Sequence, residues 1–159
     1  MANLDRARDI LERAFVISLG THDENGPWVA DLLYVVDENF WIYWMSSPNS
    51  RHSRAIEQDG RVAATVTASV AGEKDFGLQI QGIAKRLGTV VGPTIVTKLL
   101  AKMGVAKLTI GLGRLREGYE WYVLIPAVLD LIDQAQFGFE RMRLQLPDSS
   151  SVVRRRKKP

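Results

Sequence analysis

The chain has 159 residues, of which 46% are hydrophobic and 25% charged, so it is expected to form one soluble domain with a sizeable core. It contains no cysteine, which excludes disulfides, thiolate catalysis, zinc–sulfur sites and iron–sulfur clusters. No apolar run reaches the roughly 18 residues of a membrane span, and the first residues lack a signal-peptide pattern. A cytoplasmic protein with no membrane contact is therefore expected.

Positive charge is concentrated at the end of the chain. The formal net charge is +3, but five basic residues lie together at positions 154–158, and without them the charge would be −2. The rest of the chain is therefore not expected to bind nucleic acid. We predict one domain over residues 1–146 and a disordered basic tail over residues 147–159. The tail is interpreted as solubilising, with contact to RNA or acidic lipid as the alternative.

The first part of the chain predicts one helix and three antiparallel strands. Apolar residues at helical spacing predict a helix over residues 4–14. Polar clusters at residues 23–27 and 37–39 predict tight turns, and the first contains Asn25-Gly26, a pair that favours positive φ. Strands are expected on either side of these turns, over residues 14–21, 28–36 and 40–45.

A loop and a second helix follow this three-stranded meander. The loop covers residues 46–50, and the helix is predicted over residues 51–58, with Ser50 as its N-cap. A fourth strand is expected over residues 61–70, where small and β-branched residues alternate.

The fifth predicted strand spans residues 76–87. Gly82 is expected to mark a bulge that shifts the alternation of this strand. The shift would place Leu78, Ile80 and Ile83 on one face and Gln79 and Gln81 on the other.

The remainder predicts one helix and three more strands. Within residues 90–104, a helix is expected to start near Pro93 and to end just before Gly104, with Ile95, Leu99 and Met103 on its apolar face. A loop follows at residues 111–113. Strands are expected over residues 119–125, 128–133 and 137–146, with Pro126 interrupting the first two.

Six or more antiparallel strands with few helices predict a mainly β (α+β) fold, arranged as a closed or partly closed barrel. Side chains fill the interior of such a small barrel, so a ligand is expected on its outside or at a subunit seam. Most catalytic templates are absent. The two histidines, His22 and His52, are too few and too poorly spaced for a metal cluster, and no P-loop, Gly-x-Ser-x-Gly elbow or dinucleotide fingerprint occurs.

The densest group of polar residues lies where the third strand gives way to the second helix. The N-terminus of a helix attracts anions. Ser50 and Ser53 add hydroxyl donors, and Arg51 adds a guanidinium suited to phosphate. His52 would donate a further hydrogen bond. The alternative is that Ser50 only caps the helix while Arg51 and Arg54 are solvated.

Two further groups are ambiguous. Gln79 and Gln81 share one face of a strand and would suit the polar edge of a heterocycle, or would simply face solvent. The aromatic residues of the third strand fit core or dimer-interface packing better than a cofactor site; they are Phe40, Trp41, Tyr43 and Trp44.

These residues together resemble the pyridoxamine 5′-phosphate oxidase-like FMN-binding split-barrel family. The resemblance runs from about residue 10 to residue 87. It rests on the turn Asp23-Glu24-Asn25-Gly26, the run FWIYWMSSPNSRHSRAIEQDGRVAATV and the strand GLQIQGIAKRL. It implies an antiparallel six-stranded split β-barrel with a few peripheral helices. It also implies a homodimer with two FMN sites at the subunit interface.

The resemblance also implies site residues. Met45 and Ser46 match positions that contact the isoalloxazine, and Ser50 and Arg51 match a phosphate-binding Ser-Arg-Lys run in which His52 replaces the lysine. Gln79 lies on the strand that carries a flavin-contacting glutamine in the family, two residues from the matching register. The candidate cofactor-binding residues are Met45, Ser46, Ser47, Ser50, Arg51, His52 and Gln79.

Departures from the family limit the function. Phe15 and Gly20 stand where the vitamin B6 oxidases carry an arginine and a lysine, so oxidation of pyridoxamine phosphate is not expected. The hypothesis is an FMN-dependent oxidoreductase of an unassigned small-molecule substrate, with no catalytic residue identified. The alternatives are an F420-dependent reductase of the same fold and a flavin-binding or flavin-sensing module without turnover.

Overall fold

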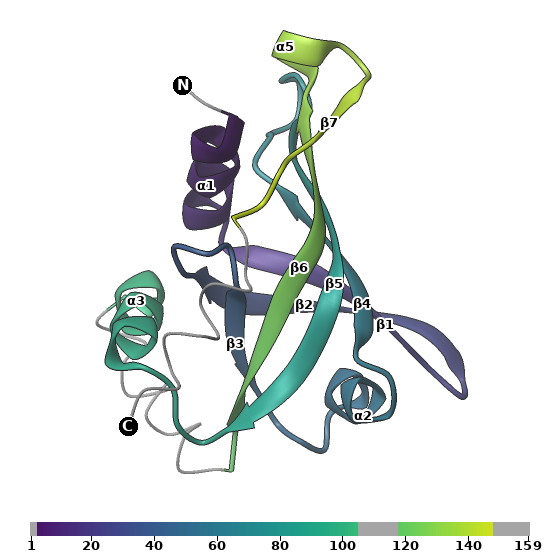
Figure 1. Ribbon diagram of the computed structural model, residues 1–159, viewed down its shortest axis with the longest axis vertical. Helices are drawn as coiled ribbons and strands as arrows, with labels where there is room; N and C mark the ends of the chain where they lie inside the picture. Colours follow the sequence, from purple (N-terminus) through teal and green to yellow (C-terminus); the bar gives the residue numbers. More distant parts are fainter. Residues whose placement is uncertain (1–2, 105–117, 148–159) are drawn as a thin grey trace.

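Seven strands form one antiparallel sheet in the order β3-β2-β1-β4-β5-β6-β7, and the sheet closes into a six-stranded barrel because β3 also pairs with β6. Figure 1 shows this computed structural model, which describes residues 3–104 and 118–147. The elements are α1 (Asn3–Arg13), β1 (Val16–Asp23), β2 (Gly26–Val36), β3 (Ile42–Ser46), α2 (Arg51–Gln58), β4 (Arg61–Thr67), β5 (Phe76–Gly88), α3 (Pro93–Met103), β6 (Glu120–Asp133), α5 (Gln134–Phe137) and β7 (Arg141–Arg143).

The predicted fold class is confirmed: the structure is a mainly β barrel with a few peripheral helices. The expected loop at residues 111–113 and the expected tail, apart from Pro147, lie outside the described residues. Within the described part of the chain, no helix is both long and apolar enough to cross a membrane.

The prediction that Pro126 interrupts a strand is wrong, because β6 runs without a break from Glu120 to Asp133. A bulge accommodates the proline. Gln81 of β5 pairs with Val128 and Gly82 pairs with Pro126, so one extra residue, Ala127, bulges between them. A proline is tolerated at such a bulge because the regular hydrogen-bond ladder is broken there.

The expected face of Ile83 is also wrong. The extra residue of the bulge belongs to β6, so the alternation of β5 continues unchanged through Gly82. Ile83 is 49% exposed and lies on the outer face with Gln79 and Gln81. The last predicted strand, over residues 137–146, is instead the end of α5 followed by the three-residue β7.

The barrel interior forms the main core. Trp44 of β3 and Tyr122 of β6 stack inside it with ring centroids 5.8 Å apart, and both are almost fully buried. The apolar face of α1 packs on the same core, where Tyr34 donates a hydrogen bond to the carbonyl of Leu11 at 2.8 Å.

The helix α3 covers part of the outside of the barrel, next to β3 in Figure 1. Its predicted apolar face is confirmed, because Ile95, Leu99 and Met103 are all buried. They pack on outward side chains of three strands, namely Val35, Tyr43, Trp121 and Val123. This second core fixes α3 over the outer face of β2, β3 and β6.

Candidate functional site

Ser50 begins α2 as its N-cap, as the sequence predicts. Its backbone is extended, with φ −67° and ψ 153°, and its Oγ accepts a hydrogen bond from the backbone N–H of Ser53 at 3.4 Å. The helix then runs from Arg51 to Gln58, so its first turn points back toward the end of β3.

Four side chains converge at this helix start, and we call them the Ser–His cluster: Ser46, Ser50, His52 and Ser53. His52 Nε2 lies 2.6 Å from Ser46 Oγ and 3.1 Å from Ser50 Oγ. Ser50 Oγ lies 2.8 Å from Ser53 Oγ. Ser46 is the last residue of β3, so strand and helix each contribute to one compact group of hydroxyls.

The imidazole of the Ser–His cluster is neutral at pH 7. His52 is only 8% exposed, and this burial lowers the pKa of its imidazole below the usual 6.5. His52 therefore contributes hydrogen bonding to the cluster but no positive charge.

Arg51 is directed toward the β1–β2 hairpin. It makes a two-pronged ion pair with Asp23, with Nε 2.8 Å from Oδ2 and Nη2 2.9 Å from Oδ1. Its guanidinium also lies 4.6 Å from the ring centroid of Trp28. The hydrogen bonds from Arg51 lower the pKa of Asp23 to about 2, so the positive charge of Arg51 is balanced within the chain.

A groove of about 160 Å³ lies beside the Ser–His cluster, between the outer face of β2 and β3 and the C-terminal half of α3; we call it the α3 groove. It is lined by Asp31, Leu32, Leu33, Met45, Ser46, Leu99, Met103 and Tyr119. Ser46 belongs to both the groove and the cluster. Because small-molecule sites usually enclose about 300 Å³ or more, this groove offers only part of an enclosing surface.

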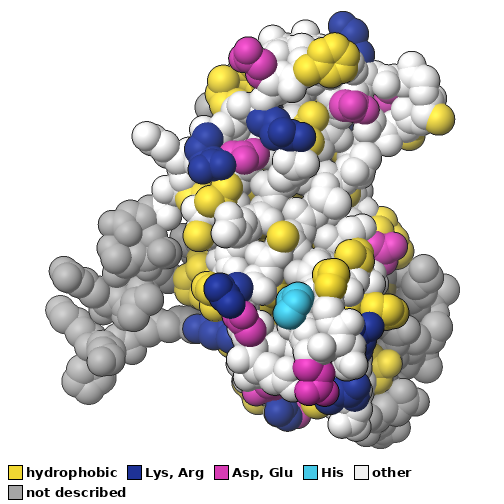
Figure 2. Space-filling model, turned by 90° about the vertical axis from the view of Figure 1, so that its right-hand side faces the viewer, with side chains coloured by type: hydrophobic (Ala, Val, Ile, Leu, Met, Phe, Trp, Pro, Cys, Tyr) yellow, Lys and Arg dark blue, Asp and Glu magenta, His cyan; other side chains and the backbone are white. Residues whose placement is uncertain are grey.

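The α3 groove borders the outer face of the sheet, and we call the area formed by the two rows of residues given below the flat outer face. Two rows of paired residues cross β2, β1, β4, β5 and β6, and only Asp31 and Asp130 in them are charged. Asp31 also lines the groove. The rows are Val29–Gly20–Ala63–Gln81–Val128 and Asp31–Ser18–Thr65–Gln79–Asp130. Figure 2 views the molecule from this side, and charged side chains gather above and below a largely uncharged middle band.

The structure brings some predicted site residues together and not others. Met45 and Ser46 line the α3 groove, and Ser47 stabilises the turn that leads to Ser50, because its carbonyl accepts the N–H of Ser50 at 3.0 Å. Gln79 is not part of this group. It lies on the flat outer face three strands from Asp31, or about 14 Å at the usual strand spacing.

Sequence reasoning missed most of the groove. The alternation of β2 indicates that Asp31 and Leu33 point outward. No local pattern shows that Leu99 and Met103 of α3 lie over that strand face, because the packing of a helix on a distant strand depends on tertiary contacts.

Comparisons with known proteins support the fold. No family model and no curated protein matches the chain. Among solved structures, the chain is similar to HutZ, the heme storage protein of Vibrio cholerae, with 17% identity, a TM-score of 0.64, and coverage of 82% of this chain and 95% of that one. It is also similar to a candidate pyridoxamine 5′-phosphate oxidase from Listeria innocua, with 14% identity, a TM-score of 0.58, and coverage of 80% and 96%.

A third similar structure is a heme-binding protein from Mycobacterium smegmatis, with 16% identity and a TM-score of 0.67. The match covers 91% of this chain but only 58% of that longer one. At such low identities the likeness concerns the fold, and it confirms the fold that the sequence resemblance implies. The chain has the split β-barrel fold of the pyridoxamine 5′-phosphate oxidase-like proteins.

Proposed function

We propose that two copies of this chain form a homodimer that binds FMN in the α3 groove and acts as an oxidoreductase on a small molecule. The observation that carries this proposal is the position of Ser46. Its hydroxyl is part of the Ser–His cluster, and the same residue lines the groove. A cofactor whose phosphate is held at the Ser–His cluster could therefore place its ring in the adjoining α3 groove.

The Ser–His cluster fits a phosphate group. Ser46 and Ser50 supply hydroxyl donors, and the first turn of α2 adds N–H groups and the positive end of its dipole. The charge of Arg51 is balanced by Asp23. Phosphate would therefore be held mainly by hydrogen bonds and the helix dipole.

The α3 groove fits one face of a flat, largely apolar ring. Leu33, Met45 and Met103 supply apolar surface, and methionine adapts its shape to an aromatic ring. Asp31 lies at the edge of this surface, where its carboxylate accepts a hydrogen bond from Ser18 at 2.5 Å. The groove is too small to enclose a flavin alone, which favours a second subunit as the other wall.

The bound flavin would supply the hydride and electron transfer. The chain would position the ring: the Ser–His cluster would anchor one end, and Leu33 and Met45 would exclude water from the face that they cover. No described residue is assigned as a general acid or base.

The flat outer face supports the homodimer. It carries small residues at Gly20 and Ala63, so a second backbone could approach closely. Val29 and Ile83 on the same side are 62% and 49% exposed, so a partner subunit would find apolar side chains to bury there. A partner on this face would also bring its own Gln79 to the interface.

Flavin fits this chain better than heme, although two similar structures are named as heme proteins. Heme iron takes an axial ligand such as histidine. His52 is buried with Nε2 between two serine hydroxyls and would have to leave both. The other histidine, His22, lies exposed at the end of β1 and does not line the α3 groove, so it would not ligate an iron bound there.

The test begins with the cofactor itself. Freshly purified protein is denatured and the mass of the released cofactor is measured, and the apoprotein is then titrated with FMN, F420 and hemin. We expect FMN, with reduction of the bound flavin by a nicotinamide donor. Preferential binding of F420 or hemin would contradict the assignment, and FMN binding without any reduction would indicate a sensing module.

Variants locate the site. Ser46→Ala and Ser50→Ala should each weaken FMN binding by about tenfold, because a hydrogen bond to a charged group contributes about 1.5 kcal/mol. Ser69→Ala, in the turn after β4, is the matched control and should bind FMN as the parent does. Equal affinities for all three variants would place the phosphate elsewhere.

A further inference from the structure

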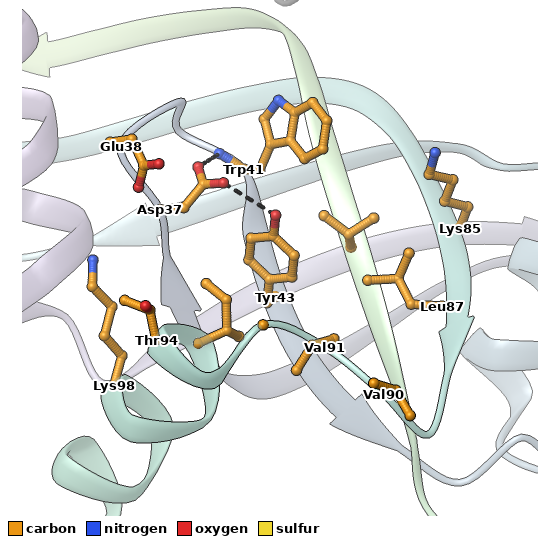
Figure 3. Close-up of a pocket in the computed structure, with 13 residues that line it drawn as sticks. Asp37, Glu38, Trp41, Tyr43, Lys85, Leu87, Val90, Val91, Thr94 and Lys98 are labelled. Atoms are coloured by element: carbon orange, nitrogen blue, oxygen red, sulfur yellow. Dashed lines mark hydrogen bonds between the residues drawn. The ribbon is translucent and has the colours of Figure 1, made fainter. Parts of the chain in front are cut away.

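A second, larger cavity of about 490 Å³ lies at the N-terminal end of α3, and we call it the Trp41 cavity. Figure 3 shows its lining, which comes from the β2–β3 turn, β3, β5, the β5–α3 connection, the start of α3 and β6. Its volume falls within the range of small-molecule sites. The Trp41 cavity and the α3 groove have no lining residue in common.

The walls of the Trp41 cavity are aromatic and aliphatic. Tyr43 lies between Trp41 and Val91 in Figure 3, and Leu87 closes a further side. Val90 is 80% exposed at the mouth. These surfaces suit a flat ring, because aromatic side chains stack on ring faces and aliphatic ones pack against them.

The aromatic wall is fixed before any ligand arrives. Asp37 Oδ1 accepts the backbone N–H of Trp41 at 2.9 Å, and Asp37 Oδ2 accepts the hydroxyl of Tyr43 at 3.1 Å. Arg8 of α1 donates to the carbonyl of Asp37 at 3.0 Å. A cavity held in shape in this way loses little conformational freedom on binding.

The turn beside this wall also stores backbone strain. Phe40 has φ 65°, the only positive φ of a non-glycine residue in the described chain. Such a conformation costs about 1–3 kcal/mol for a bulky residue, and it persists only where surrounding contacts enforce it. Phe40 is buried, and the guanidinium of Arg8 lies 4.4 Å from its ring centroid. These contacts hold the strained turn that directs Trp41 to the cavity.

Two lysines and two acids line the Trp41 cavity, and the lysines offer the donors for an anionic group. Lys85 is exposed, and within the described residues its ammonium has no acceptor. Lys98 donates to the carbonyl of Val36 at 2.8 Å and keeps further N–H donors. The carboxylate of Asp37 is buried and already accepts hydrogen bonds on both oxygens, which leaves Glu38 as the one exposed acid among the lining residues.

We propose that the Trp41 cavity binds a small aromatic anion, such as an aryl carboxylate. The ring would lie against Trp41 and Tyr43, with Val91 opposite, and the anionic group would pair with Lys85. The positive end of the α3 dipole at Gly92 adds to the attraction. This site is separate from the proposed FMN site and does not depend on it.

The test uses calorimetric titration of the purified full-length protein with three ligands of one shape: 1-naphthoate, neutral 1-methylnaphthalene and the 1-naphthylmethylammonium cation. We expect 1-naphthoate to bind most tightly and the cation most weakly. Lys85→Gln should weaken naphthoate about fivefold, which corresponds to about 1 kcal/mol for an exposed ion pair. It should leave the neutral ligand unchanged. Lys74→Gln, an exposed lysine in the β4–β5 turn, is the matched control.

Two further variants locate the ligand. Trp41→Phe keeps a ring in the wall and should bind nearly normally, whereas Trp41→Leu should weaken naphthoate by about tenfold through loss of stacking. Ser46→Ala, in the α3 groove, should have no effect, so failure of the FMN proposal would leave this result intact. Absence of naphthoate binding at millimolar concentration, equal binding of the cation, an unchanged Lys85→Gln variant, or displacement of naphthoate by FMN with no complex that holds both ligands would each overturn the proposal.

Discussion

Arg51 and Asp23 form a two-pronged ion pair that joins the first residue of α2 to the β1–β2 hairpin, 28 residues earlier in the chain. The side chain that most suggests a phosphate ligand in the sequence is thus already paired. The carboxylate that pairs with it balances its charge next to the Ser–His cluster.

Removing this carboxylate should strengthen anion binding. In Asp23→Asn the guanidinium of Arg51 is no longer neutralised, so we expect FMN affinity to rise severalfold and to become more sensitive to salt. Isothermal titration at two ionic strengths measures both effects. Asp59→Asn is the control, because Asp59 also forms an ion pair with an arginine, Arg61, on the exposed surface. A fall in FMN affinity for Asp23→Asn alone would show that the ion pair itself positions the site.

His52 should make the protein sensitive to acid. Burial lowers the pKa of His52 in the folded state, so below the unfolded value of about 6.5 the unfolded chain binds the extra proton first. Stability is then complete above pH 6.5 and falls as the pH is lowered through that value. Urea denaturation between pH 7.5 and 5 should show a smaller loss of unfolding free energy in His52→Gln than in the parent. His22→Gln, at an exposed position, should follow the parent curve.

Gly82 should tolerate no side chain. A Cβ there would lie 2.3 Å from the carbonyl oxygen of Ile125, a backbone atom of the bulged strand β6. Gly82→Ala should therefore lower the free energy of unfolding by about 1–3 kcal/mol, the range for overpacked cores. Thermal denaturation followed by circular dichroism measures this. Gly92→Ala, where a Cβ meets nothing within 4 Å, should cost far less.

Lys102 should affect stability in the alkaline range. Burial lowers its pKa to about 8, while the carboxylate of Glu12 opposes this shift. Between pH 8 and about 10.5 the unfolded chain keeps a proton that the folded chain has lost, so stability rises with pH relative to a variant without this amine. The difference in unfolding free energy between the parent and Lys102→Met should therefore change in the parent's favour across this interval. A constant difference would show that the lysine titrates normally.

The flat outer face should be sensitive to charge if it is the dimer interface. Ala63 is the middle residue of the row that runs from Val29 to Val128, and that row carries no charge. In a dimer, Ala63→Glu would therefore add one carboxylate from each subunit to an uncharged part of the interface. We expect dimerisation to weaken by at least about tenfold, with FMN affinity falling in parallel. Sedimentation velocity and FMN titration measure the two effects. Ala71→Glu, in the exposed β4–β5 turn, is the control, and a dimer that survives Ala63→Glu would place the interface elsewhere.

What the sequence predicts well is local. The helix at Arg51–Gln58 and its Ser50 cap were both predictable, because capping and periodicity depend on residues within one or two turns. The face of Ile83 was not, since it depends on which of two paired strands holds the extra residue. The partner of Arg51 and the position of α3 over Met45 depend on contacts between distant segments. The same holds for the Trp41 cavity, because the aromatic pattern of β3 alone indicates core packing.

The helix α3 forms a wall of both the Trp41 cavity and the α3 groove. The eleven residues of α3 contribute Ile95 to the Trp41 cavity and Leu99 and Met103 to the α3 groove. A tilt of α3 that widens one of these two sites changes the width of the other at the same time. A ligand in one site that displaces α3 would therefore alter the affinity of the other site for its own ligand. Thermodynamic reciprocity requires each ligand to change the affinity for the other by the same factor.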